Sequence, residues 1–192
     1  MIPYFAELRH DYPFSLDSVV IDVGAYNGDF ALQFARKYGC RIVAFEPITK
    51  HADWVRQKLA AFGNCEVIEL AISDSGRREQ WAIKGDMTSF HSAGDETQEV
   101  KTEDVATVFH ALRFDIVDLL KLNCEGSEYA ILDRILATNL ILRFVNIQIQ
   151  WHCCVPDFFM RRARISVALD KTHERTWQDW QFDCGHENWR LR

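Results

Sequence analysis

The most constraining feature of the chain is a block near its start, in which an apolar run passes directly into a glycine-containing loop and then into a helix. Residues 19–23 read Val-Val-Ile-Asp-Val, and the β-branched run from Val19 to Ile21 predicts a strand buried on both faces. Gly24 and Gly28 relieve the backbone where the chain turns and where a ligand must come close. Such a loop directs helix-start N–H groups above the strand, an arrangement that binds nucleotide-like ligands.

The spacing of the glycines narrows the choice of ligand. A dinucleotide fingerprint places a second glycine two residues after the first, and Tyr26 occupies that position here. A pyrophosphate is therefore not expected, which disfavours a nicotinamide (NAD)-dependent oxidoreductase. An ordinary strand-to-helix turn without any ligand is the alternative interpretation of the block.

The next predicted strand indicates that the ligand contains a ribose. Residues 42–45 form a short apolar run that ends at Glu46-Pro47. An acid about 20 residues beyond a glycine loop is placed to accept hydrogen bonds from ribose hydroxyls. The alternative is that Glu46 is simply a solvated acid at the end of a strand.

The net charge, the apolar runs and the cysteines of the chain indicate which partners and which cellular location to expect. The 192 residues carry 22 Lys and Arg against 28 Asp and Glu, a formal net charge of -6, which disfavours a nucleic-acid partner. No apolar run approaches the length of a membrane span, so we expect a cytoplasmic protein without a membrane partner. The six cysteines lack paired C-x-x-C spacing and are expected to be reduced, and we predict no metal site.

Strand and helix signals alternate along the chain, which predicts a parallel sheet with crossover helices in a three-layer α/β fold. With 48% hydrophobic residues, the length suits a single domain over residues 1–192. Residues 1–17 are a lead-in. Residues 77–104 are expected to form irregular strands and a long loop that walls the substrate site, and residues 153–192 a helix and a closing strand.

A second informative block reads Lys121-Leu122-Asn123-Cys124-Glu125-Gly126-Ser127-Glu128. A buried strand opens here into polar residues at its carboxyl end, where open α/β sheets bind ligands. The two carboxylates flank a glycine turn that leads into a helix. Complementarity to the helix dipole would favour acids at this position without any chemistry, more so for Glu128 than for Glu125.

Together these blocks resemble the FkbM family of methyltransferases. The resemblance rests on Ile21-Asp22-Val23-Gly24-Ala25-x-x-Gly28, on Phe45-Glu46-Pro47 and on the run from Leu120 to Glu128, and it covers residues 18–152. It implies a Rossmann-like methyltransferase sheet that is mostly parallel and is closed by a C-terminal antiparallel strand. It also implies S-adenosylmethionine as cofactor and O-methylation of a hydroxyl on a sugar or a secondary-metabolite-type acceptor.

By this resemblance, the cofactor lies across three adjoining strand ends. The glycine loop and Asp22 would face its methionine part, Glu46 its ribose, and the loop after the third strand its adenine. The candidate cofactor-binding residues are Asp22, Gly24, Ala25, Tyr26, Asn27, Gly28, Glu46, Pro47, Ala71, Ile72, Ser73 and Asn123. Asn123 stands where the family most often carries Asp, which removes a charge near the sulfonium and weakens the case for a divalent metal.

Methylation of an alcohol requires removal of its proton, and a neutral imidazole or a carboxylate suits this role near neutral pH. His152, at the end of a predicted strand, is the first candidate base, and Glu125 is the second, as a base or as an anchor for the acceptor hydroxyl. Lys121 is a further catalytic candidate, and His91, in the long loop, is a weaker one. His152 as a hydrogen-bonded wall residue, and catalysis by positioning alone, remain alternatives.

The expected partner is a small-molecule or glycan acceptor, and a homodimer is a minority interpretation. A non-catalytic Rossmann-like binding or scaffold module is the main alternative to an enzyme. Asn123 and the short length of the chain are compatible with that alternative.

Overall fold

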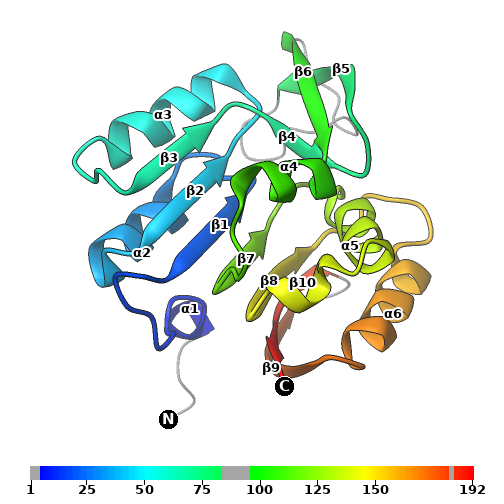
Figure 1. The fold of residues 1–192 in the computed structure, drawn as a ribbon. Coiled ribbons are helices and arrows are strands. Elements are labelled where there is room, and N and C mark those ends of the chain that lie inside the picture. The colour runs from blue at the N-terminus through cyan, green and yellow to red at the C-terminus, as the bar shows by residue number, and fades with distance from the viewer. Residues whose placement is uncertain (1–4, 84–95, 182–183) are drawn as a thin grey trace.

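The computed structural model describes residues 5–83, 96–181 and 184–192. Its central sheet consists of β1 (Val19–Val23), β2 (Arg41–Phe45), β3 (Cys65–Ile68), β7 (Leu119–Leu122), β8 (Asn146–Trp151), β9 (His173–Gln181) and β10 (Cys184–Leu191). The strand order is β3-β2-β1-β7-β8-β10-β9 (Figure 1). Within this order, neighbouring strands pair in parallel for β3, β2, β1, β7 and β8. β10 runs antiparallel to both of its neighbours, β8 and β9. The sheet confirms the predicted fold with its C-terminal antiparallel strand, although β9 adds one strand to the expected C-terminal elements.

Helices cover both faces of this sheet (Figure 1). They are α1 (Phe5–Leu8), α2 (Asp29–Tyr38), α3 (Thr49–Leu59), α4 (Val105–Leu112), α5 (Glu128–Ala137), α6 (Phe158–Leu169) and the 3-10 helix η2 (Leu140–Arg143). Because side chains alternate along a strand, β1 directs Val20 toward α2 and α3 and Ile21 toward α4 and α5. The result is the expected three layers, with an apolar core on each side of the sheet.

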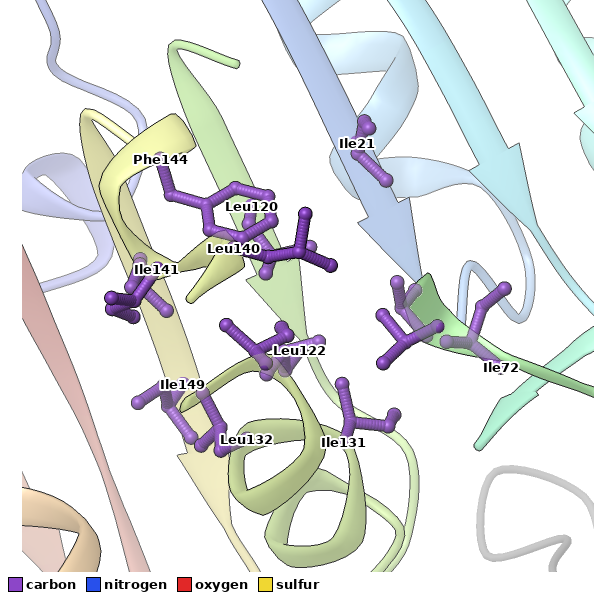
Figure 2. Packing of buried hydrophobic residues seen from close by; sticks show 14 of the residues in the cluster. Ile21, Ile72, Leu120, Leu122, Ile131, Leu132, Leu140, Ile141, Phe144 and Ile149 are labelled. Atoms are coloured by element: carbon purple, nitrogen blue, oxygen red, sulfur yellow. The ribbon is translucent and has the colours of Figure 1, made fainter. Parts of the chain in front are cut away.

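The larger core lies between the sheet and α5. Ile131 and Leu132 of α5 face Leu122 of β7 and Ile149 of β8 (Figure 2). All four side chains are fully buried, and burying an aliphatic side chain of this size stabilises the fold by about 1.5–3 kcal/mol. This packing fixes the start of α5 against the ends of β7 and β8, which is where the candidate site lies.

A small second sheet stands beside the first. Its strands are β4 (Ala71–Ser73), β5 (Arg77–Ile83) and β6 (Glu96–Asp104), in the order β4-β6-β5. Strands were expected within residues 77–104, but those in the described part are regular and not irregular, because β5 and β6 pair in one continuous antiparallel register. Their regularity could not be predicted because Trp81 and Val100 are their buried apolar residues, too few to produce a clear alternation. Residues 84–95 lie outside the described residues.

The lead-in is attached to the sheet through Tyr12. Its hydroxyl lies 3.0 Å from Gln148 Oε1 and 3.1 Å from Asn188 Oδ1, and its backbone N–H donates to the hydroxyl of Tyr38. Burial, the largest influence, raises the pKa of the Tyr12 hydroxyl, which keeps this donor protonated. Among the described helices, none combines the length and the apolar character needed to cross a membrane.

Candidate functional site

The loop after β1 is tied to the ends of both neighbouring strands. The N–H groups of Gly24 and Ala25 donate to the carbonyl oxygen of Phe45, over 3.0 and 3.1 Å. Gly24 has a φ of 78°, and a Cβ atom there would lie 1.9 Å from the carbonyl oxygen of Asn123. Position 24 therefore requires glycine, because the loops after β1 and β7 touch one another at this point.

One cavity opens beside these loops. The predicted site residues that line it are Gly24, Tyr26, Glu46, Pro47, Ala71, Ile72, Asn123 and Glu125. Its wall also includes His51, Trp81 and Ser127, which the sequence analysis did not single out. Trp81 is the one tryptophan of the strongly polar strand Arg77–Ile83, and its isolated position there could have indicated a buried or ligand-binding side chain. His51 gave no such signal, because its position depends on how α3 packs beside β2.

Glu46 is buried at the end of β2, with both carboxylate oxygens held by the backbone. Oε2 accepts the N–H of Tyr26 at 2.8 Å, and Oε1 accepts the N–H of Ile48 at 3.0 Å. The ring of His51 packs against that of Tyr26, with centroids 4.9 Å apart, and its Nδ1 lies 3.6 Å from Oε1. Because a carboxylate oxygen can accept more than one hydrogen bond, each oxygen keeps capacity for a ligand hydroxyl.

Asn123 presents an unsatisfied acceptor at the same cavity. Its Oδ1 atom is buried and has no hydrogen-bond partner within the described part of the chain. A buried acceptor without a donor costs about 1–3 kcal/mol. A ligand that carries an N–H or ammonium group can remove that cost, so this residue fits the amino end of the expected cofactor.

Asp22 and Lys121 form a buried ion pair beneath the loop. They are cross-strand partners on β1 and β7, with Lys121 Nζ 2.7 Å from Asp22 Oδ1 and 2.8 Å from the carbonyl oxygen of Gly24. The Asp22 side chain is 0% exposed and that of Lys121 is 5% exposed. Neither side chain lines the cavity, so the expected contact of Asp22 with the methionine part and the catalytic role of Lys121 stay predictions. The pair supports the glycine loop from below, through the bond from Lys121 to the Gly24 carbonyl oxygen.

Three other predicted contacts shape the loop and do not line the cavity. Ala25 is buried in the core under α2 and α3. Asn27 Oδ1 accepts the N–H of Asp29 at the start of α2, over 3.0 Å. Gly28 has a φ of 78° and lies so close to α3 that a Cβ atom would meet Val55 at 3.2 Å.

A second cavity adjoins the first and shares Ile72, Trp81 and Ser127 with it. Its other wall residues are Ser73, Arg77, Glu79, Thr102, Gly126, Ala130, Val155, Pro156 and Arg161. The predicted cofactor residue Ser73 thus lies in this second cavity. Glu125 lines the first cavity and the next residue, Gly126, lines the second, so the turn before α5 forms their junction.

His152 follows β8, and its imidazole lies between two carboxylates. Nε2 is 3.1 Å from Glu125 Oε1, and Nδ1 is 3.1 Å from Glu128 Oε1. Burial alone would lower the pKa of His152, but the hydrogen bonds and charges of the two glutamates outweigh it and raise the pKa to about 10. The ring is therefore protonated near neutral pH and cannot accept a further proton, which disfavours His152 as the base. The weaker candidate His91 lies outside the described residues.

Comparison with known proteins then decides the family. The sequence matches the methyltransferase FkbM domain over residues 22–184. The chain belongs to the FkbM methyltransferase family. This match confirms the predicted family and its methyltransferase class, and neighbours solved with S-adenosylhomocysteine support S-adenosylmethionine as the cofactor. No curated protein matches the sequence.

Solved methyltransferase structures share the fold of this FkbM chain. An rRNA methylase from Streptococcus thermophilus has a TM-score of 0.64 at 15% identity, over 100% of this chain and 98% of its own. A Streptococcus mutans protein described as a methyltransferase, solved with S-adenosylhomocysteine, has a TM-score of 0.64 at 12% identity over 100% of both chains. TrmK of M. capricolum, also solved with S-adenosylhomocysteine, has a TM-score of 0.56 at 10% identity, over 100% of this chain and 70% of its own. Because these neighbours include rRNA methylases, the fold gives no support to the expectation that nucleic acid is excluded.

Proposed function

We propose that this FkbM chain transfers a methyl group from S-adenosylmethionine to a hydroxyl of a small-molecule or glycan acceptor. The main support for this proposal is that the two cavities meet at one turn, where Glu125 lines the first cavity and Gly126 lines the second. A donor in the first cavity and an acceptor in the second would meet beside a carboxylate. Such a group suits the proton transfer that O-methylation requires.

The residues of the first cavity fit the donor. Glu46 offers spare acceptor capacity for the two ribose hydroxyls, and the unsatisfied Oδ1 of Asn123 suits the amino group of the methionine part. Gly24 keeps the loop free of side chains where β1 and β7 approach. Ala71 and Ile72 provide an apolar wall for the adenine.

The wall of the second cavity suits an acceptor with several hydroxyls. Ser73 and Ser127 contribute hydroxyls, which can both donate and accept hydrogen bonds. Glu79 forms an ion pair with Arg77 and accepts the indole N–H of Trp81 at 2.8 Å, so these charges are already balanced. A polyhydroxyl ligand beside the Trp81 indole agrees with such a wall.

For methyl transfer to a hydroxyl, the protein must mainly position the two substrates and provide a proton acceptor. When bound, the cofactor supplies a methyl group on a sulfonium, which is electrophilic without a metal. The acceptor oxygen must lose its proton as it attacks, and we assign that proton to the Glu125 carboxylate. Alignment of the acceptor oxygen with the methyl group supplies much of the remaining rate.

We expect no nucleic-acid acceptor. The chain has a net charge of -6, and the arginines of α6 are engaged within the protein. Arg164 lies 2.6 Å from Asp133, and the guanidinium of Arg162 lies 4.1 Å from the centre of the Trp180 ring. A phosphate backbone requires a basic surface, so charge is the basis of this expectation.

An assay of S-adenosylhomocysteine formation tests the proposal. The donor is incubated with monosaccharides, disaccharides, polyketide-type alcohols or RNA, each with and without EDTA. We expect product with a hydroxylated small molecule, no effect of EDTA, and no product with RNA. Methylation of RNA alone would contradict the proposed acceptor class.

The same assay tests the role of Glu125. Glu125→Gln keeps the size of the side chain and removes its charge, so turnover should fall by about 10²-fold or more while donor affinity changes little. Glu174→Gln, which removes an exposed carboxylate that pairs with Arg190 on the far strands of the sheet and lines neither cavity, is the matched control and should retain activity. Full activity of Glu125→Gln would remove this residue from the chemistry.

A further inference from the structure

Glu128 makes contacts that a helix-capping acid does not need. It is the first residue of α5, and its side chain is fully buried. Oε2 accepts the N–H of Gly126 at 2.9 Å, and Oε1 accepts the backbone N–H of His152 at 2.9 Å. An acid that only complements a helix dipole can remain at the surface. Glu128 instead links the start of α5 to the end of β8.

The ring of His152 completes this link. It lies 3.1 Å from Glu128 through Nδ1 and 3.1 Å from Glu125 through Nε2. A neutral imidazole has a single N–H, so only the protonated ring donates to both carboxylates. Three neighbouring side chains add no charge near neutral pH: burial lowers the pKa of His186 to about 4, raises that of the Cys154 thiol to about 11, and raises that of the Cys124 thiol, which lies 3.8 Å from Glu128 Oε2. One cation therefore lies between two carboxylates.

The backbone at Glu125 indicates that its position is imposed. Glu125 has a φ of 52°, which residues with side chains rarely adopt, and the next residue, Gly126, has a φ of 100°. Strained conformations of this kind persist where the surrounding structure holds them, and they are frequent at functional sites. The ion pair with His152 holds the side chain, and the Cys154 thiol donates to the Glu125 carbonyl oxygen at 3.5 Å.

We propose that Glu128 is a positioning residue, which fixes the ring of His152 so that the ring fixes the Glu125 carboxylate at the junction of the two cavities. This inference rests on the proposed function, since an acceptor at that junction is what gives the orientation of Glu125 its purpose. Glu128 itself lines neither cavity wall, so it acts through His152 and not by contact with the acceptor.

NMR titration of the ring nitrogens of His152 tests the arrangement without an acceptor. In the wild-type protein both nitrogens should be protonated at pH 8. Glu128→Gln and Glu125→Gln should each lower the pH of half-protonation by at least about one unit, because each removes one carboxylate partner. Asp133→Asn, on the same helix, is the control and should leave the titration unchanged. Because Glu128 is buried and its variant can fail to fold, the partly exposed Glu125 tests the same cluster from the other side.

The turnover number of a Glu128 variant distinguishes a positioning role of this residue from a role in capping α5 alone. In the acceptor assay, Glu128→Gln should lower kcat at least about tenfold with an unchanged calorimetric affinity for S-adenosylhomocysteine. An unchanged His152 titration, or a variant that lowers only the melting temperature, would overturn the positioning role. Absence of S-adenosylhomocysteine binding by the wild-type protein would instead contradict the proposed function, so the two failures are distinguishable.

Discussion

Glu46 and Glu125 are held at the site in different ways. Glu46 accepts two backbone N–H groups, from Tyr26 and Ile48, so its position is part of the fold itself. Glu125 depends on a side-chain partner, His152, and on a left-handed backbone conformation. Substitutions around Glu46 should therefore affect ligand affinity, whereas substitutions around Glu125 should affect turnover.

Replacing Glu46 tests the ribose contact. Glu46→Ala should weaken the binding of S-adenosylhomocysteine by about 1–3 kcal/mol, because the ligand hydroxyls lose their acceptors. Isothermal titration calorimetry measures the change. Glu69→Ala, which removes an exposed acid hydrogen-bonded to Thr49, is the control and should bind normally. Unchanged affinity in Glu46→Ala would remove this residue from the donor site.

The charge of His152 should appear in the pH dependence of stability. Its pKa of about 10 in the folded protein lies above the ordinary value of 6.5. The stabilisation is therefore complete below about pH 6.5 and is lost as the pH rises toward 10. Urea denaturation of the wild type and of His152→Gln should show a stability difference that shrinks by about 2–4 kcal/mol over this range. A difference that stays constant with pH would show that the ring is neutral in the folded protein.

Among the elements, the junction of β6, α4 and α5 depends on Asp104. Its Oδ1 accepts the N–H of Ala106 at 2.6 Å and that of Thr107 at 3.2 Å, which caps α4. Its Oδ2 accepts the Arg134 Nε–H from α5 at 2.7 Å. One side chain thus joins the small sheet, which walls the second cavity, to the two helices beside it.

Asp104→Ala should destabilise the protein by about 0.5–2 kcal/mol, the usual effect of losing an N-cap. Asp104→Asn retains the capping oxygen and should cost less, since only the charge of the partly exposed pair with Arg134 is lost. Chemical denaturation measures both variants. Equal losses would show that the ion pair, and not the cap, is the stabilising contact.

The elements that could be predicted from the sequence are those with a strong local pattern. β1, the glycine loop and α2 follow from a buried β-branched run with glycines at its end, and β7 with α5 follows from the same kind of transition. The regular pairing of β5 with β6 could not be predicted, because these strands bury few apolar residues and are stabilised mainly by pairing with each other.

The location of the site could be predicted more fully than the roles of its residues. Glu46 and Asn123 reach the expected cavity because the ends of parallel strands share one edge of the sheet. Lys121 faces Asp22 because the two are cross-strand partners, a register that the sequence does not reveal. The charge of His152 depends on Glu128, 24 residues earlier in the chain, so it required the tertiary structure.

At the scale of the whole molecule, the parallel sheet places both cavities at the carboxyl ends of its strands. The ends of β1, β2 and β7 form the first cavity, and the small sheet with α5 and α6 forms the second beside it. Figure 1 shows the small sheet next to the carboxyl ends of the central strands, where it can wall an acceptor site. Donor and acceptor are thereby expected on one continuous surface.

Calorimetric titration of the wild-type protein with S-adenosylhomocysteine and, separately, with NAD tests whether the first cavity binds the methyl donor. We expect saturable binding of one S-adenosylhomocysteine per chain and no binding of NAD, because Tyr26 stands where a pyrophosphate-binding loop needs glycine. Binding of NAD, or the absence of any heat with S-adenosylhomocysteine, would contradict the assignment of this cavity to the methyl donor.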